Sequence, residues 1–146
     1  MLKFVSESVS QTEAIAESLG KTLKSGTVVA YFGGLGMGKT AFTRGLAKGM
    51  GITADVSSPT FAIVNDYGGN PPLVHFDMYK VESWDDLYSS GFFDYLDMGA
   101  ILAVEWSENI ENALPDNTLR ITINQGENEN QRIITIEGAE NENFSS

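Results

Sequence analysis

The sequence predicts an α/β fold, in which a central, mostly parallel sheet is flanked by helices and ends in an antiparallel C-terminal hairpin. Continuous apolar runs at 28–32 and 101–106 are typical of strands buried on both faces of a parallel sheet. Segments with helical spacing of apolar residues alternate with such runs. Near the C-terminus, the alternating run 119–123 and the run 133–136 are separated by a polar loop, which indicates the hairpin.

Length and composition favour one ordinary globular domain. The chain has 146 residues, of which 42% are apolar and 20% charged. We expect a single domain over 1–138 and a disordered polar tail over 139–146. No apolar run approaches the roughly 18 residues that span a bilayer, and the first ten residues are too polar for a secretory signal. With no cysteine, disulfide and thiolate chemistry are excluded, and we expect a cytoplasmic protein without a membrane partner.

The charge balance is unfavourable for direct binding of nucleic acid. Nine Lys and Arg residues stand against 20 Asp and Glu residues, for a formal net charge of -11. Nucleic-acid binders gain affinity by neutralising phosphates with basic patches. A broad patch of that kind is not available here, so we expect a partner to hold any nucleic acid. A zinc site is not expected either, because the one histidine, His75, has no cysteine or second histidine to join it.

Two helices are predicted in the first third of the chain. The pattern at 10–13 is that of a capping box, which opens a helix. Its apolar face has a helical spacing, at Ile15, Ala16, Leu19 and Leu23. A glycine cluster follows the buried run 28–32, and the apolar residues beyond it lie four apart, at Phe42, Leu46 and Met50. This second helix is expected to end near Gly49 or Gly51.

The middle of the chain predicts a pair of strands and a short helix. The strands are expected at 61–67 and 73–78, separated by a Gly/Pro turn at 68–72. A capping pattern at 83–86 opens the helix, which stops at Gly91. We expect His75 to be half-buried with its hydrogen bonds satisfied. The aromatic residues of this region are expected in the core rather than in a stacking platform: Trp84, Phe92, Phe93 and Tyr95.

Residues 33–40 match the phosphate-binding pattern G-x-x-x-x-G-K-[ST], between a buried strand and a helix. Glycines let the backbone turn so that consecutive N–H groups face one anion, and the helix adds its positive N-terminal end. Lys39 supplies a mobile charge to the β and γ phosphates, and the Thr40 hydroxyl suits Mg²⁺. The pattern predicts a P-loop NTPase. Its expected nucleotide contacts are Gly33, Gly34, Leu35, Gly36, Met37, Gly38, Lys39, Thr40 and Ala41.

Asp77 and Glu105 each end a strand and are candidate magnesium and catalytic residues. A carboxylate that follows several apolar residues is costly to bury without a counter-charge, which a metal ion would provide. The alternative is that each acid is only the exposed end of a strand. Thr60, in the Ser/Pro-containing segment 57–61, is a candidate sensor of the γ phosphate. Its alternative is an ordinary turn.

Several segments together resemble the bacterial TsaE family, also called YjeE, the P-loop ATPases of tRNA threonylcarbamoyladenosine synthesis. The resemblance covers nearly the whole chain. The matching segments are 36–40, 44–46, 58–61, 75–80, 104–106 and 114–115. The phosphate-binding pattern is shared by many proteins, whereas the combination of the other segments is specific.

The resemblance implies ATP and Mg²⁺ as cofactors, with Thr40, Glu105 and Asp77 at the metal. It also implies a switch-like role for Thr60 and positions beside the nucleotide for Trp106 and Thr12. For Thr12 the alternative is a solvent-exposed residue in the first turn of a helix. The chain departs from the family's pattern at three positions: Gly34, Met37 and Lys80. Where the family commonly has arginine, Lys80 keeps the charge but loses the bidentate fork.

The function implied by the resemblance is ATP binding with slow, partner-stimulated hydrolysis. The partners would be a two-protein threonylcarbamoyl transferase complex, formed by homologues of TsaB and TsaD, with tRNA contacted only indirectly. Two alternatives stay open. A small-molecule kinase shares the phosphate loop but needs a lid and several arginines, and this chain has three: Arg44, Arg120 and Arg132. A nucleotide-gated assembly factor would bind ATP without appreciable turnover.

Overall fold

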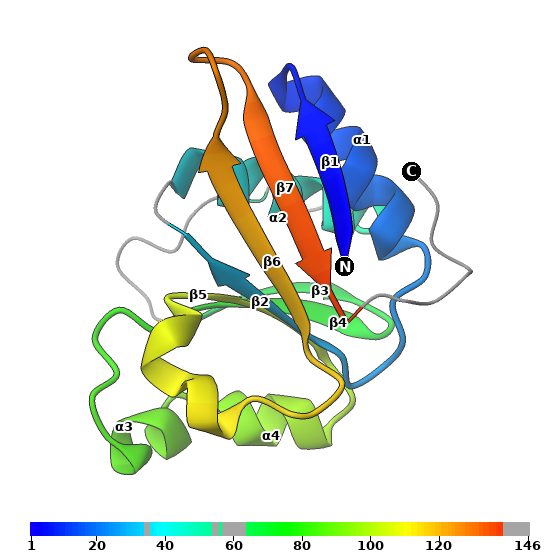
Figure 1. Ribbon diagram of the computed structural model, residues 1–146. Helices are drawn as coiled ribbons and strands as arrows, with labels where there is room; N and C mark the ends of the chain where they lie inside the picture. The colour runs from blue at the N-terminus through cyan, green and yellow to red at the C-terminus, as the bar shows by residue number, and fades with distance from the viewer. Residues whose placement is uncertain (34–35, 54–55, 57–63, 139–146) are drawn as a thin grey trace.

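Four parallel strands form the centre of the fold (Figure 1). The computed structural model describes residues 1–33, 36–53, 56 and 64–138. The parallel strands lie in the order β6 (Leu119–Gln125), β2 (Val28–Phe32), β5 (Ile101–Glu105) and β4 (Pro72–Asp77). The apolar residues of β2 and β5 are buried on both faces of the sheet, as their continuous runs predicted. Because parallel strands end at the same edge, the carboxyl ends of β2, β4 and β5 are neighbours.

Both edges of the sheet are antiparallel. On one side β7 (Arg132–Glu137) pairs with β6, which confirms the predicted hairpin, and β1 (Leu2–Ser6) pairs with β7. On the other side β3 (Val64–Gly69) pairs with β4. The sheet is therefore mixed, and the predicted parallel character belongs to its centre. The expected strand residues 61–63 and the tail 139–146 lie outside the described residues.

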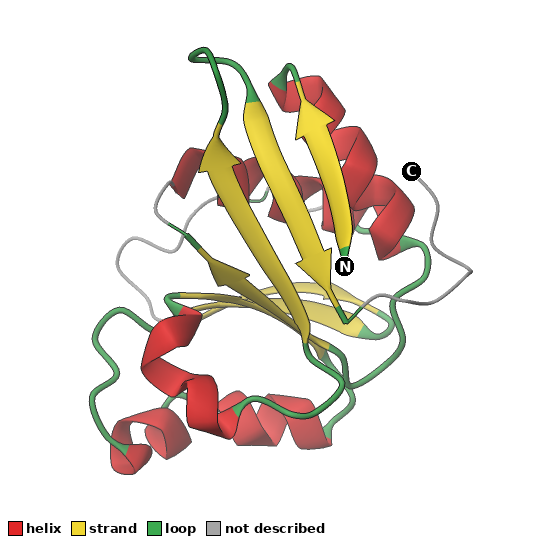
Figure 2. Ribbon diagram, in the orientation of Figure 1, coloured by secondary structure: helices red, strands yellow, loops and turns green. Residues whose placement is uncertain are grey.

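One face of the sheet is covered by two helices, α1 (Val9–Gly20) and α2 (Gly36–Gly49), which pack on one continuous core with the sheet (Figure 2). The predicted capping box was misplaced by two residues. Ser8 is the N-cap, and its side chain accepts from the N–H of Gln11 at 3.1 Å. The Gln11 side chain accepts in return from the N–H of Glu7 at 2.7 Å. Ser8 and Gln11 thus form a variant of the capping box, in which Gln11 accepts from the residue before the N-cap.

Close contact between α1 and α2 depends on glycines at their crossing. A Cβ on Gly45 would collide with the carbonyl of Glu13, and one on Gly49 with the carbonyl of Glu17. On the facing helix, a Cβ on Gly20 would lie 2.5 Å from the Leu46 carbonyl. The backbones therefore touch directly, and the start of α1 is held beside the start of α2.

The opposite face carries short helices: α3 (Trp84–Ser89), α4 (Phe92–Asp97) and the 3₁₀ segment η1 (Ser107–Ala113). Helix α3 ends before Gly91, as predicted, whereas α4 and η1 were not predicted. Phe92 is fully buried against Phe76, but Trp84 is 54% exposed and stacks on Phe93, so its predicted place in the core was wrong. None of the helices in the described residues has the length and apolar character needed to cross a bilayer.

Candidate functional site

The glycine-rich segment lies at the end of β2, where the chain turns into α2. Gly33 has a φ of 98°, a left-handed conformation that favours glycine. Residues 34–35 and the side chain of Met37 lie outside the described part, and the nucleotide contacts predicted for 33–41 all stay predictions. Lys39 is buried, and its Nζ donates a hydrogen bond to the Gly33 carbonyl at 2.7 Å. The ammonium group therefore lies across the segment that the pattern assigns to phosphates.

The first turn of α2 is fixed to the sheet in two ways. Gly38 lies against β6, where a Cβ would be 2.6 Å from the Cγ2 of Ile123. The hydroxyl of Thr43 donates its one hydrogen to the Lys39 carbonyl at 2.9 Å. It must therefore accept from the hydroxyl of Tyr31, which lies 2.7 Å away. Burial raises the pKa of Tyr31, which keeps this hydroxyl protonated as a donor. The start of α2 is thereby tied to β2.

The two predicted carboxylates are neighbours, because Asp77 of β4 and Glu105 of β5 are directly paired in register. Paired residues of parallel strands share one face of the sheet. Asp77 is partly exposed, and its Oδ1 accepts from the N–H of Tyr79 at 2.9 Å. Glu105 is only 6% exposed. It is therefore not the exposed end of a strand.

The described partner of Glu105 is a histidine. His75 Nε2 lies 2.7 Å from Glu105 Oε2, and His75 Nδ1 lies 3.2 Å from the hydroxyl of Tyr67. The expectation that His75 is hydrogen-bonded is confirmed, but the ring is fully buried rather than half-buried. Among the described residues, no group of three or more His, Cys, Asp and Glu side chains is arranged to hold a metal ion.

Trp106 follows Glu105 directly, at the turn from β5 into η1. It has a φ of 59°, unusual for a bulky residue, and is 45% exposed. Its ring packs edge-on against Tyr79, with ring centroids 4.9 Å apart. The side chain of Asn109 donates to the carbonyl of Met78 at 2.8 Å. The residues that follow β4 and β5 are thus held together beside the carboxylates.

Thr12 lies at a different place in the site. It is 2% exposed, so the interpretation as an exposed first-turn residue was wrong. Its hydroxyl is 2.7 Å from that of Ser6, which itself donates to the Ser8 carbonyl. A cavity of about 540 Å³ opens beside it, between the starts of α1 and α2 and the β6–β7 hairpin. The lining includes three predicted nucleotide contacts: Thr12, Gly38 and Ala41.

Sequence reasoning missed the hairpin side of this cavity, which is lined by Gln125, Glu129, Asn130 and Arg132. No motif marks these residues, and they reach the site only because β6 lies next to β2. The predicted residues therefore form two groups. Thr12 and Ala41 line the cavity, while Asp77, Glu105 and Trp106 lie at the strand ends. Thr40 is partly buried in the first turn of α2, and Thr60 lies outside the described residues.

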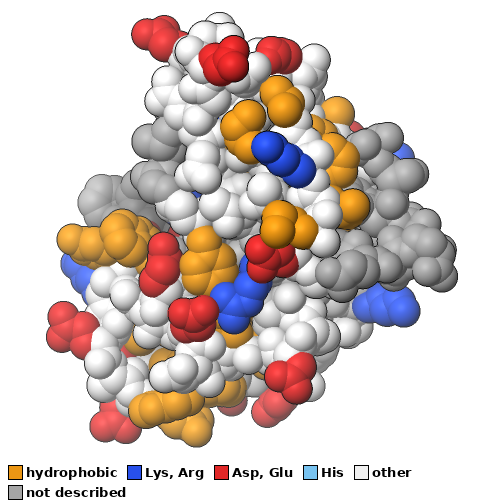
Figure 3. Space-filling view, viewed as in Figure 1, with side chains coloured by type: hydrophobic (Ala, Val, Ile, Leu, Met, Phe, Trp, Pro, Cys, Tyr) orange, Lys and Arg blue, Asp and Glu red, His pale blue; other side chains and the backbone are white. Residues whose placement is uncertain are grey.

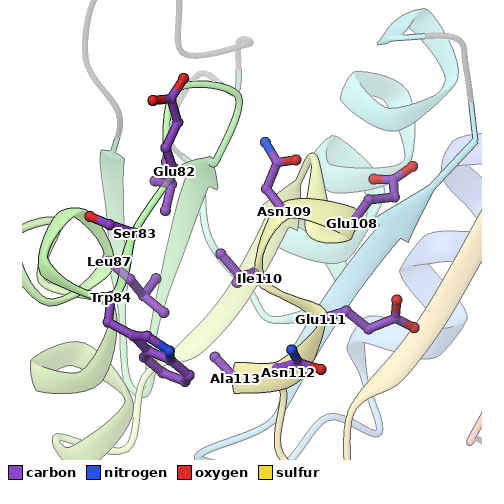
Figure 4. A pocket seen from close by; sticks show the side chains of 11 residues that line it. Glu82, Ser83, Trp84, Leu87, Glu108, Asn109, Ile110, Glu111, Asn112 and Ala113 are labelled. Carbon is purple, nitrogen blue, oxygen red and sulfur yellow. The ribbon is translucent and has the colours of Figure 1, made fainter.

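A second cavity, of about 300 Å³, lies on the other face of the sheet between α3 and η1 (Figure 4). Its apolar floor includes Leu87 and Ile110, and Trp84 forms one wall. The glutamates Glu82, Glu108 and Glu111 also line it. It contains none of the predicted site residues, and its acidic lining is unfavourable for a polyphosphate.

A segment with the glycine-rich phosphate pattern between a buried parallel strand and a helix, together with carboxylates on adjacent strand ends, is typical of an α/β P-loop NTPase fold. The model of the family described as "Threonylcarbamoyl adenosine biosynthesis protein TsaE" matches residues 6–134. The chain belongs to the TsaE family.

Individual relatives agree with this membership. A Bacillus subtilis protein named "tRNA threonylcarbamoyladenosine biosynthesis protein TsaE" is 39% identical over 139 residues, which cover 94% of this chain and 87% of the relative. A Treponema pallidum protein of the same name is 34% identical, with 84% and 90% covered. The crystal structure of Bacillus subtilis YdiB has a TM-score of 0.75 and 35% identity, covering 92% of this chain and 83% of that one.

Proposed function

We propose that this protein is an ATPase of tRNA threonylcarbamoyladenosine biosynthesis, which binds magnesium–ATP at the start of α2 and hydrolyses it slowly. The observation that carries the proposal is the placement of Lys39. Lys39 is buried, and its ammonium group donates to the carbonyl of Gly33, directly after β2 at the carboxyl ends of the parallel strands, where open α/β sheets bind ligands. The pathway follows from family membership and from the names of the relatives.

The phosphate end of the nucleotide would occupy the first turn of α2. The first turn of a helix directs backbone N–H groups and a positive dipole end outward, and both favour an anion. When the nucleotide binds, the hydrogen bond from Lys39 Nζ to the Gly33 carbonyl would be replaced by one to a phosphate oxygen. Mg²⁺ is usually held by one or two carboxylates together with substrate phosphates, rather than by an all-protein cage. The pair Asp77 and Glu105, with the Thr40 hydroxyl, fits that ligand set. The bound ion would stabilise the charge that develops on the transferred phosphoryl group.

The nucleoside end fits the cavity beside Thr12. Its volume of about 540 Å³ is ample for a nucleoside, and it begins at Gly38 and Ala41 in the first turns of α2. Because the Thr12 hydrogen is directed to Ser6, its oxygen lone pairs are the part offered to a ligand. Arg132 and Asn130 add polar groups from the hairpin.

We infer that tRNA is held by partner proteins, for which homologues of TsaB and TsaD are the candidates. The net charge of -11 opposes direct binding to a polyanion. On the face seen in Figure 3, the basic side chains are isolated from one another, while acidic ones are spread among them. A basic surface wide enough for tRNA is therefore expected on a partner.

The kinase alternative gains no support from the arginines. Arg44 forms an ion pair with Glu13, at 3.1 Å, and Arg120 forms one with Glu111, at 3.0 Å. Of the three, Arg132 alone lines the cavity near the proposed nucleotide. A phosphoryl-transfer enzyme of that class needs several cations around the transferred group.

Phosphate release from ATP, measured with and without the TsaB and TsaD homologues of the same organism, tests the proposal. We expect slow turnover alone, stimulation by the partner pair, and loss of turnover in Glu105→Gln with an unchanged circular dichroism spectrum. ATP-dependent complex formation without any turnover would instead support the assembly factor. A phosphorylated nucleoside product would support the kinase.

A further inference from the structure

We propose that His75 is a positioning residue, which fixes the rotamer of the Glu105 carboxylate toward the magnesium site. The inference rests on the proposed function, because it takes Glu105 to be a metal-site residue. Its structural basis is the 2.7 Å contact between His75 Nε2 and Glu105 Oε2, which is fully buried on the histidine side.

The sheet register brings the two side chains together. His75 precedes Asp77 by two residues, so both lie on the same face of β4. Its direct neighbour across the strands is Ala103, two residues before Glu105 on β5. A small side chain at that position leaves room for the imidazole ring to lie diagonally across β5 and reach the carboxylate. The contact therefore follows from the pairing of the strands.

The donor and the acceptor of each hydrogen bond in the row Tyr67–His75–Glu105 follow from the groups involved. A carboxylate only accepts, so Nε2 of His75 carries the hydrogen and donates to Glu105. In the neutral ring the other nitrogen, Nδ1, then accepts from the hydroxyl of Tyr67 at 3.2 Å. The order of donation is Tyr67 to His75 to Glu105. This arrangement is the one in which an outer residue orients a metal-ligating group.

Several neighbours on this face of the sheet are apolar, including Leu73, Ile101 and Val29, so a leucine at 75 would pack there without any polar group to satisfy. The polar ring at this position therefore serves the one buried carboxylate that it contacts, Glu105. In the described residues, the contacts of the Glu105 carboxylate involve only Oε2. The histidine thus engages one oxygen and orients the other, Oε1, for a different ligand.

The first test compares His75→Leu, which removes the donor, with His75→Gln, whose amide keeps one. Phe76→Leu is the matched control, because Phe76 is equally buried on the same strand but faces the opposite core. The affinity of the protein for a fluorescent ADP analogue is measured at increasing Mg²⁺ concentration, and the quantity compared is the Mg²⁺ concentration at which the gain in affinity is half-maximal. Loss of an outer-shell partner typically weakens metal affinity by roughly 10- to 100-fold. We expect a shift of at least roughly 10-fold for His75→Leu, a smaller one for His75→Gln, and none for Phe76→Leu.

The second test uses the unmodified protein and does not depend on a variant that folds. His75 is the one histidine of the chain, so its ring nitrogens give a single pair of signals in long-range proton–nitrogen NMR spectra of untagged protein. We expect the Nε2–H tautomer, and a shift of its signals when Mg²⁺ is added to the ADP-bound protein. The Nδ1–H tautomer would overturn the inference.

The outcomes separate this inference from the proposed function. If wild type binds the ADP analogue in a Mg²⁺-dependent manner and His75→Leu has the same Mg²⁺ midpoint, the positioning role is wrong and the nucleotide site stands. An equal shift in Phe76→Leu would reduce the effect to general destabilisation and also overturn the role. If wild type does not bind the analogue with Mg²⁺, the proposed function and the inference both fail.

Discussion

Glu13 shows how a single residue links the two helices that build the site. It accepts from Arg44 and from Lys48, both at 3.1 Å, across the α1–α2 contact. Partial burial by itself would raise the pKa of Glu13, but hydrogen bonds from Lys48 and Arg44, together with their charges, outweigh it and lower the pKa. The carboxylate is therefore stabilised in its charged form by folding.

Glu13→Gln is predicted to cost about 1 kcal/mol of unfolding free energy at neutral pH, the scale of two partly exposed ion pairs. The sign follows from the lowered pKa. The stabilisation is complete above the unfolded-state value of 4.5 and is lost as pH falls through the lower folded-state value. Urea unfolding of both proteins at a series of pH values checks this. A difference that stays constant from neutral pH down to about pH 3 would contradict the ion-pair account.

At the scale of elements, the contact between α1 and α2 is the most demanding packing in the fold. Gly45→Val is predicted to lower the unfolding free energy by at least about 2 kcal/mol, since its side chain would collide with Ala16 and the Glu13 carbonyl. Ala14→Val is the control, because it adds the same branched side chain at an exposed position of α1. Urea unfolding measures both. Equal unfolding free energies for the two variants would contradict the prediction, because the helices would then accommodate the valine without loss of stability.

The elements that the sequence predicted are those with a strong local signal. Continuous apolar runs identified β2 and β5, and four-residue spacing identified α2. The strand β1 was missed because its partner, β7, is distant in the chain, so only the assembled sheet shows why Leu2 and Phe4 face the core. Helix α4 was missed because only one residue, the C-cap Ser90, separates α3 from Gly91, which is already the N-cap of α4.

In the candidate site, too, some residues could be predicted from local sequence, whereas others depend on the assembled sheet. The phosphate pattern and the strand-end acids are local features, and the structure brings Asp77 and Glu105 into register as their positions on parallel strands suggested. The role of His75 depends on the diagonal geometry across two strands, which spacing along one strand does not reveal. The hairpin residues of the cavity, such as Arg132, depend on strand order.

At the scale of the whole molecule, the excess of acidic residues should make the fold sensitive to salt. Like charges repel in the compact state, and the net charge is -11. Raising KCl from low concentration to about 0.15 M reduces the Debye length to about 8 Å. We predict that the melting temperature, measured with EDTA and without nucleotide, rises by roughly 2–4 °C, as for a gain of about 1 kcal/mol. A fall in melting temperature would mean that attractive ion pairs outweigh the repulsion.

The central claim is that a magnesium nucleotide binds at the start of α2, and calorimetric titration of magnesium–ATP tests it most directly. Wild type is compared with Lys39→Ala and with Lys48→Ala, a control at the far end of the same helix. We predict binding by wild type and by Lys48→Ala. For Lys39→Ala, loss of a charge-assisted contact is expected to weaken binding by at least roughly 10-fold, with an unchanged circular dichroism spectrum. Equal affinity of Lys39→Ala and wild type would contradict the account.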